Sequence, residues 1–140
     1  MQQCTKNRIV VTAVLTTVLM FCCAAQAQSS TCPIQPTQVK DIDTQLAIEF
    51  DNVSGKQVAT YRFGLTFFDL NGKAHVFPQP LSGTIQLSPR GHRNAIWQNR
   101  MARQFLFPYA QAFVQRVVFA DGTSWVDDGS HACSIISVQE

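Results

Sequence analysis

The chain lacks the motifs by which many enzymes are recognised from sequence. No Gly-x-Ser-x-Gly stretch marks a serine nucleophile on a sharp turn, and the three histidines, His75, His92 and His131, do not have the His-x-x-x-His spacing of a zinc site. We therefore expect a protein that is not an enzyme and that carries no cofactor. The alternative is a small secreted hydrolase or cation-binding protein whose site is not visible in the sequence.

Charge is absent from a long stretch near the N-terminus. Lys6 and Arg8 precede an uncharged run over 9–25, which ends at an Ala-Gln-Ala site of the small-x-small pattern that signal peptidase cuts. We predict a helical signal peptide, 1–27, followed by one domain, 28–140, of a secreted or periplasmic protein. A membrane anchor is the alternative, because the run approaches the roughly 17 to 25 residues that span a bilayer. The three threonines in this run and the cleavage site after it favour a signal peptide that is cleaved off over an anchor. We therefore expect the protein to contact the membrane only through a leader that has not been cleaved.

Net charge disappears with the leader. The whole chain has 11 basic and 9 acidic residues, and two of the basic ones, Lys6 and Arg8, belong to the leader. The mature part is therefore formally neutral, and the sequence gives no argument for nucleic-acid binding.

Acidic residues are missing between Leu70 and Ala120. The arginines of this stretch form a candidate binding surface: Arg90, Arg93, Arg100, Arg103 and Arg116. On one face of a sheet they would suit an anionic polysaccharide, a lipid head group or an acidic protein partner. The alternative, which we favour, is that strands from both ends of the chain interleave and pair these charges, because clustering in sequence says little about clustering on a Greek-key surface.

Cysteine is scarce in the mature part. Three of the five cysteines lie in the leader, which leaves Cys32 and Cys133. In an oxidising compartment these two most economically pair with each other. Closing a loop of about 100 residues stabilises a fold by about 4 to 5 kcal/mol in the chain-entropy model. Two unpaired buried thiols are the alternative.

No long amphipathic helix is evident, and alternation with a period of two predicts strands instead. The pattern is visible over 45–51 and clearest over 59–67, and the loop between them predicts a hairpin. The apolar face of the second strand holds Ala59, Tyr61, Phe63, Leu65 and Phe67. Asn71-Gly72 predicts a tight turn into a short strand, 73–77, which Pro78 ends at a sheet edge.

The second half predicts further short strands over 85–87, 93–98, 111–119, 124–126 and 133–138. The turn Pro89-Arg90-Gly91 predicts that the first two of these pair, and Asp121-Gly122 predicts another hairpin. A short helical turn over 99–107 ends before Pro108. The predicted fold is all-β, an antiparallel β-sandwich of about seven to eight strands.

The stretch 125–131 holds two carboxylates, a hydroxyl and an imidazole. A calcium site needs six or more oxygen ligands, commonly alternating along a loop that contains a glycine, and this stretch lacks that spacing. Turn formation, with Asp and Ser side chains bonding their own backbone, explains it better. Trp97, Trp125 and Tyr109 are either an exposed platform for a sugar or, as is more typical of single aromatics in strands, part of the core and its rim.

Several turn-and-strand motifs resemble those of a known group. The run 58–69, the turn Asn71-Gly72, and the segment 119–130 before Cys133 resemble small exported bacterial proteins of uncharacterised function. They are more loosely similar to the immunoglobulin-like modules of bacterial surface proteins. The resemblance implies fold and compartment but carries over no functional residue. We expect an exported, non-catalytic binding or structural module of the cell envelope, with an envelope protein or an anionic polysaccharide as its partner.

Mass spectrometry of protein exported from the full chain tests the processing and the cysteine pairing together. We expect a mass that begins at Gln28 and no alkylation of Cys32 or Cys133 without reductant. A protein that still begins at Met1, or that alkylates without reduction, would contradict the respective prediction.

Overall fold

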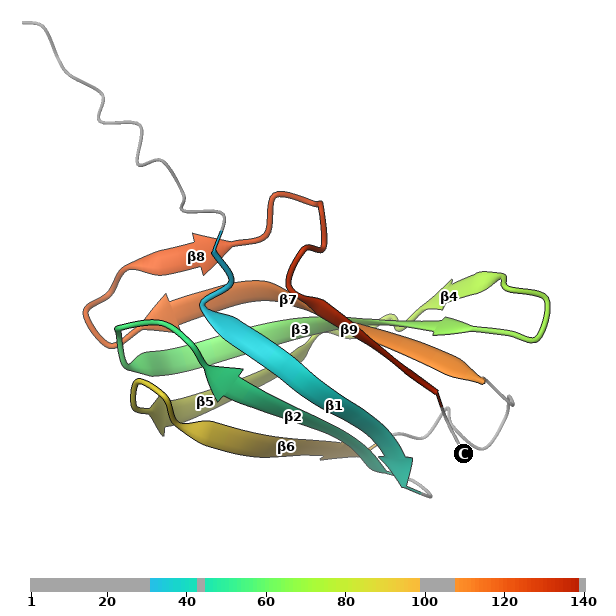
Figure 1. Cartoon of the computed structure of the whole chain (residues 1–140), viewed down its shortest axis with the longest axis horizontal. Helices are drawn as coiled ribbons and strands as arrows, with labels where there is room; N and C mark the ends of the chain where they lie inside the picture. Colours follow the sequence, from blue (N-terminus) through green and yellow to red (C-terminus); the bar gives the residue numbers. More distant parts are fainter. Residues whose placement is uncertain (1–30, 43–44, 99–107, 139–140) are drawn as a thin grey trace, which may run out of the picture.

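Two antiparallel sheets make up the described part of the chain (Figure 1). The computed structural model describes residues 31–42, 45–98 and 108–138. These residues contain no helix, and so none that could cross a membrane. Nine strands are present: β1 (Ile34–Ile42), β2 (Gln45–Asn52), β3 (Val58–Phe68), β4 (Ala74–Val76), β5 (Leu81–Leu87), β6 (His92–Gln98), β7 (Tyr109–Phe119), β8 (Ser124–Val126) and β9 (Ser134–Val138).

The two sheets differ in size. The smaller one has three strands in the order β1-β2-β6. The larger one has six, in which β3 and β7 pair at the centre, β4 and β5 pair with β3, and β8 and β9 pair with β7. The prediction of an all-β, antiparallel fold is confirmed, with nine strands in place of seven to eight.

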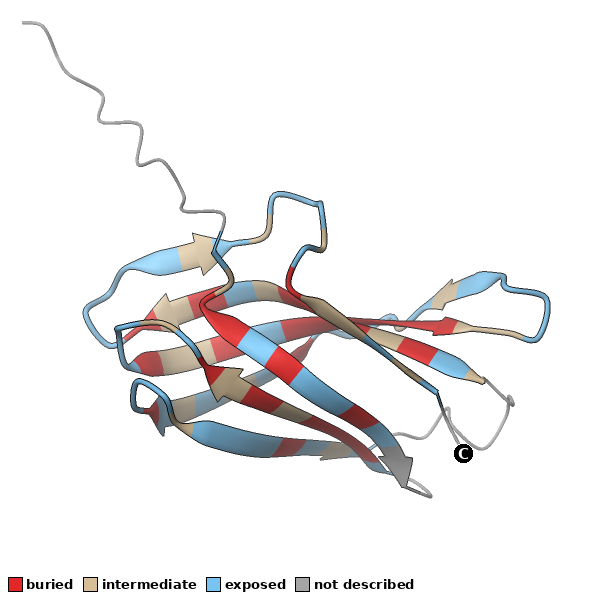
Figure 2. Ribbon diagram, viewed as in Figure 1, coloured by how far each residue is buried: buried red, intermediate tan, exposed pale blue. Residues whose placement is uncertain are grey.

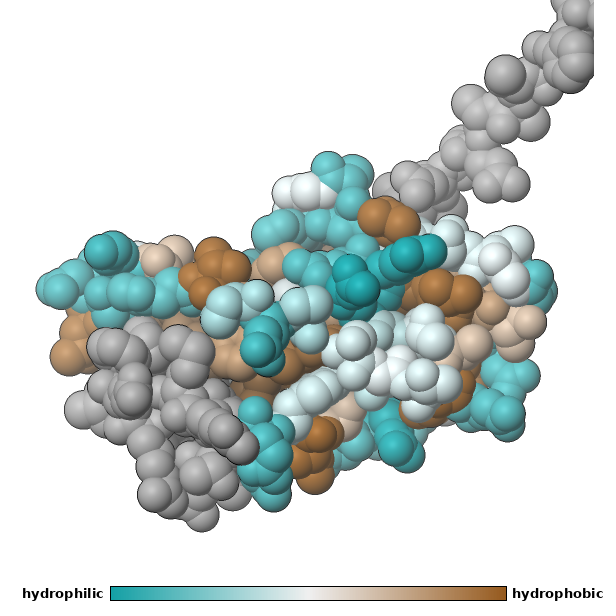
Figure 3. All heavy atoms as spheres, turned by 180° about the vertical axis from the view of Figure 1, so that it is seen from behind, coloured by the Kyte–Doolittle hydropathy of each residue, from teal (hydrophilic) through white to brown (hydrophobic). Residues whose placement is uncertain are grey.

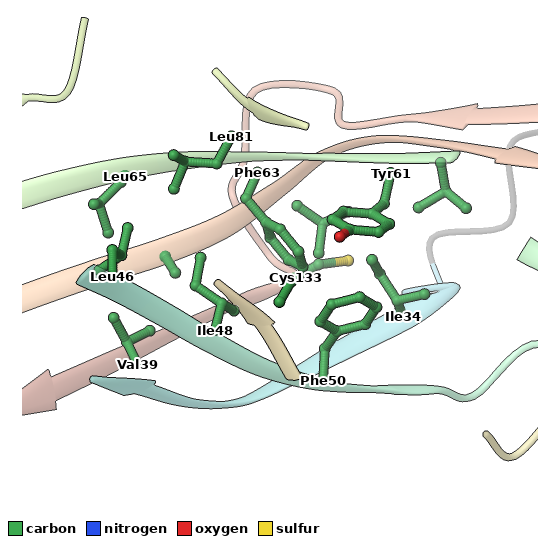
Figure 4. Packing of buried hydrophobic residues seen from close by; sticks show 14 of the residues in the cluster. Ile34, Val39, Leu46, Ile48, Phe50, Tyr61, Phe63, Leu65, Leu81 and Cys133 are labelled. Carbon is green, nitrogen blue, oxygen red and sulfur yellow. The ribbon is translucent and has the colours of Figure 1, made fainter. Parts of the chain in front are cut away.

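The core fills the space between the sheets. Buried residues recur along β1, β2, β3 and β7, which gives the banded colouring of Figure 2, and in the middle of β3 the residues from Phe63 to Phe67 are all buried. The predicted apolar face of β3 is confirmed at Tyr61, Phe63, Leu65 and Phe67, whereas at the start of the strand Val58 is buried and Ala59 is only half-buried. Phe63 packs edge-on against Phe50 of the facing sheet, with ring centroids 5.2 Å apart (Figure 4). The two sheets thus bury their apolar faces against each other.

Two predicted strand pairings are wrong. The strands β2 and β3 do not form a hairpin, because β2 pairs with β1 and β6 while β3 belongs to the other sheet. Likewise β5 pairs with β3, and β6 pairs with β2. In both places a short loop carries the chain from one sheet to the other. Strands with one strongly apolar face bury it most completely by facing each other across a core.

The two glycine turns are confirmed. Asn71-Gly72 joins β3 to β4, and Asp121-Gly122 joins β7 to β8. The φ angles of Gly72 and Gly122 are 77° and 82°, in the left-handed region that a glycine enters without steric cost. The short strand β4 lies at a sheet edge before Pro78, as predicted. The predicted helical turn over 99–107 lies outside the described residues.

The disulfide between Cys32 and Cys133 confirms the predicted pairing. It joins the segment before β1 to the segment before β9, with the Cα atoms 5.5 Å apart and a sequence separation of 101 positions. Because β1 and β9 belong to different sheets, the bond ties the sheets together at this edge. Such a bond is compatible with an oxidising, extracytoplasmic environment.

A buried asparagine joins two loops at another edge. Asn52 is 0 % exposed, and its Nδ2 donates to the carbonyl oxygens of Lys56, Leu87 and Ser88 at 2.8 to 3.0 Å. Its Oδ1 accepts from the backbone N–H of Ser54 at 3.0 Å. The side chain thus satisfies the carbonyl groups of both loops that cross between the sheets.

Replacing Asn52 tests this role. We expect Asn52→Ala to lower the free energy of unfolding by about 2 to 4 kcal/mol, because it leaves buried carbonyl groups without a donor. Asn94→Ala, on the exposed side of β6, is the control and should change it by less than about 0.5 kcal/mol. Urea unfolding of the exported protein measures both values, and equal effects would contradict the role of Asn52.

Candidate functional site

The outer face of the six-stranded sheet carries the candidate site. The ladder registers place its side chains in rows that run across the strands. One row holds Ser82, Arg62, Arg116 and Val126, from β5, β3, β7 and β8. The next holds Thr84, Thr60, Val118 and Ser124. Figure 3 shows hydrophilic side chains gathered over the middle of this face.

A bulge in β7 places Arg116 on the outer face. The register passes from Arg62↔Arg116 to Phe63↔Val114, so Gln115 is an extra residue on β7. Before the bulge the even-numbered Ala112 and Val114 point into the core, and after it the odd-numbered Val117 does. Without the extra residue, alternation would turn Arg116 inward. The bulge therefore brings Arg116 beside Arg62.

The two arginines have no acidic partner. Both side chains are exposed, and neither forms an ion pair with another described residue. By contrast, two lysines form ion pairs: Lys40 with Glu49 and Lys56 with Asp121. Two like charges directly opposite each other in a ladder are destabilising. An arrangement of this kind is typical of a surface that binds an anion.

Two hollows flank the arginine pair. The first, of about 570 Å³, is lined by hydroxyl groups of Thr60, Ser82 and Thr84 together with Arg62 and Arg116. Hydroxyls both donate and accept hydrogen bonds, and arginine only donates. A ligand that carries negative charge together with hydroxyl or phosphate oxygens would complement this lining.

The second hollow, of about 440 Å³, lies on the other side of the same arginines. Its floor is the ring of Phe113, which lies across Gly64 where any Cβ would overlap it. The imidazole of His131 stacks on that ring with centroids 3.8 Å apart. Asp127 also lines this hollow, and its carboxylate oxygen Oδ2 lies 3.8 Å from the Nε2 of His131.

The loop before β9 uses its carboxylates to bond itself. Asp127 accepts from the backbone N–H groups of Gly129 and His131 at 3.2 and 3.4 Å. Asp128 accepts from the N–H of Ser130 at 2.9 Å, and hydrogen bonds from Ser130 hold the pKa of this carboxyl below its ordinary value. The turn interpretation of this stretch is confirmed. No group of three or more metal-ligating side chains occurs among the residues that the structure describes.

The other histidines also lie beside carboxylates. The Nε2 of His75 is 3.1 Å from Asp69, and the Nδ1 of His92 is 2.7 Å from Asp51. Hydrogen bonding to His75 is the main cause that lowers the pKa of Asp69. Neither pair lines one of the two hollows.

Of the three predicted arginines that the structure describes, Arg116 lines the two hollows and the other two do not. Arg90 lies in the turn before β6, with a φ of 64°, and Arg93 lies on β6 in the other sheet. Arg93 is near Tyr61. Burial raises the pKa of Tyr61, and the positive charge of Arg93 offsets part of this increase. Because Arg100 and Arg103 lie outside the described residues, the five-arginine surface stays a prediction.

Arg62 was missed by the sequence analysis. Charge counted along the chain placed it in the acidic first part, before Leu70. The signal that could have found it is the alternation of β3, which puts Arg62 on the face opposite Tyr61 and Phe63. The tryptophans are not part of the site, since Trp97 and Trp125 pack against the core.

Comparisons with known proteins add little to this geometry. No protein-family model matches the chain, and no curated protein matches it. One solved structure that partly matches the chain is described as the X-ray structure of Northeast Structural Genomics Consortium target SoR45. It is 12% identical over 76% of this chain and 87% of its own, with a TM-score of 0.42.

Proposed function

We propose that the protein is an exported, immunoglobulin-like β-sandwich module of the cell envelope that binds a partner without catalysing a reaction. The leader-like N-terminus and the Cys32–Cys133 disulfide support export. The two facing antiparallel sheets support the immunoglobulin-like interpretation. The binding surface is the outer face of the six-stranded sheet.

The main support for this proposal is that Arg62 and Arg116 lie opposite each other and neither forms an ion pair with another described residue. The guanidinium group is always charged and presents a planar set of donors that matches carboxylate and phosphate oxygens. Two such groups on adjacent strands converge on one anionic group of a partner, and hydroxyls of Ser82, Thr60 and Thr84 lie beside them. The partner is accordingly an acidic envelope component, such as an anionic polysaccharide or an acidic protein.

Soluble polymers test the proposal. Titration calorimetry of the exported protein should show binding to polygalacturonate or dextran sulfate, weakening as salt is added, and no binding to neutral dextran. The double variant Arg62→Gln/Arg116→Gln should bind at least about tenfold more weakly, because a hydrogen bond to a charged group contributes about 1.5 to 3 kcal/mol.

The matched control is Arg93→Gln, which removes one exposed arginine from the other sheet. It should keep the affinity of the unchanged protein within about twofold, because Arg93 lines neither of the two hollows. No binding to either anionic polymer, or equal weakening by the control, would overturn the proposal.

A further inference from the structure

The outer face of the six-stranded sheet is apolar at its other end. Beyond Gly64 and Phe113, one row holds Val76, Thr66, Gln111 and Ile136, and the next holds Ala74, Phe68, Tyr109 and Val138. Four of these are large and exposed: Val76 by 73%, Ile136 by 62%, Val138 by 66% and Tyr109 by 47%. We call these four residues the apolar end. Figure 3 shows apolar side chains on this face toward β4.

The apolar end is built by three strands that are distant in sequence. Val76 comes from β4, Tyr109 from β7, and Ile136 and Val138 from β9, with β3 between β4 and β7. Single exposed apolar residues are ordinary on a protein surface, whereas a contiguous group on one face marks an interaction site. The group shares its face with the arginine pair.

The two outer faces of the protein differ in charge pairing. On the smaller sheet Lys40 pairs with Glu49, and Asp51 lies 2.7 Å from His92. On the larger sheet neither Arg62 nor Arg116 forms an ion pair with a described acidic residue, although Asp127 lines the second hollow with them. A partner that complements this face must offer negative charge and apolar contact together.

The separation of these features indicates an extended partner. Seven residues of β7 separate Tyr109 from Arg116, which is about 20 Å at about 3.3 Å per residue. A single anion in the arginine hollows would not reach the apolar end. A glycan would be expected to stack on exposed rings at the arginines, but Tyr61, the aromatic residue that lines the first hollow, is only 7% exposed.

We infer that the outer face of the six-stranded sheet docks on a membrane surface that contains anionic phospholipid. Arg62 and Arg116 bind lipid phosphate groups, as bidentate donors do. The apolar end enters the head-group region, where tyrosine and aliphatic side chains are well accommodated. This inference rests on the proposed function, because it names the anionic partner of the same arginines.

Vesicle sedimentation tests the docking. The exported protein should sediment with vesicles of phosphatidylcholine and phosphatidylglycerol and stay in solution with phosphatidylcholine alone. The variant Val76→Ser/Ile136→Ser/Val138→Ser should bind the mixed vesicles at least about tenfold more weakly while binding polygalacturonate as the unchanged protein does. If the triple variant does not fold, as judged by circular dichroism, Val76→Ser and Ile136→Ser are measured singly, with smaller losses expected from each.

A matched control changes exposed apolar residues elsewhere. Val53 and Ile96 are 58% and 57% exposed, in the loop after β2 and on β6, and Val53→Ser/Ile96→Ser should bind vesicles normally. Equal losses in the control, or full vesicle binding by the triple variant, would overturn the inference. Binding of polygalacturonate without binding of mixed vesicles would overturn the membrane inference and leave the proposed function standing. Binding of neither probe would overturn both.

Discussion

The pairing of β3 with β7 is the constraint on which both faces of the larger sheet depend. This ladder runs from Val58↔Phe119 to Phe68↔Tyr109 through the centre of the sheet. Its register sets Phe63 beside Val114 in the core, and the bulge next to them turns Arg116 outward. Side chains alternate along a strand, so a slip of one residue would bury the arginines and expose the core. The packed interior and the candidate site are two results of one register.

The two sheets are held together away from that ladder. At one edge the Cys32–Cys133 disulfide joins them, and at another Asn52 bonds the loops that cross between them. Beside Asn52, the Nε1 of Trp97 on β6 donates to the carbonyl oxygen of Ser82 on β5 at 3.3 Å, and its ring lies edge-on to Tyr61. These contacts close the core without using the outer face of the larger sheet. Its unpaired arginines and apolar end are therefore free to meet a partner.

Local sequence patterns predicted most strands and turns. They could not predict which distant strands become neighbours. The glycine turns, the alternation of β3 and the disulfide followed from short patterns and a count of cysteines. The strand β1 was missed because a register shift near Pro36 breaks its alternation, so Ile34 and Val39 face the core with an irregular spacing. The site itself depends on which strands become neighbours, and a charge count along the chain cannot bring Arg62 to Arg116.

Solution NMR of the exported protein tests the register most directly, through nuclear Overhauser contacts between the backbone protons of β3 and β7. The account predicts that Arg62 contacts Arg116 and that Phe63 contacts Val114, with Gln115 unpaired between them. A regular ladder that continues from Phe63↔Val114, in which Arg62 faces Gln115 and Tyr61 faces Arg116, would contradict it. Arg116 would then point into the core with Tyr61 instead of sharing the outer face with Arg62.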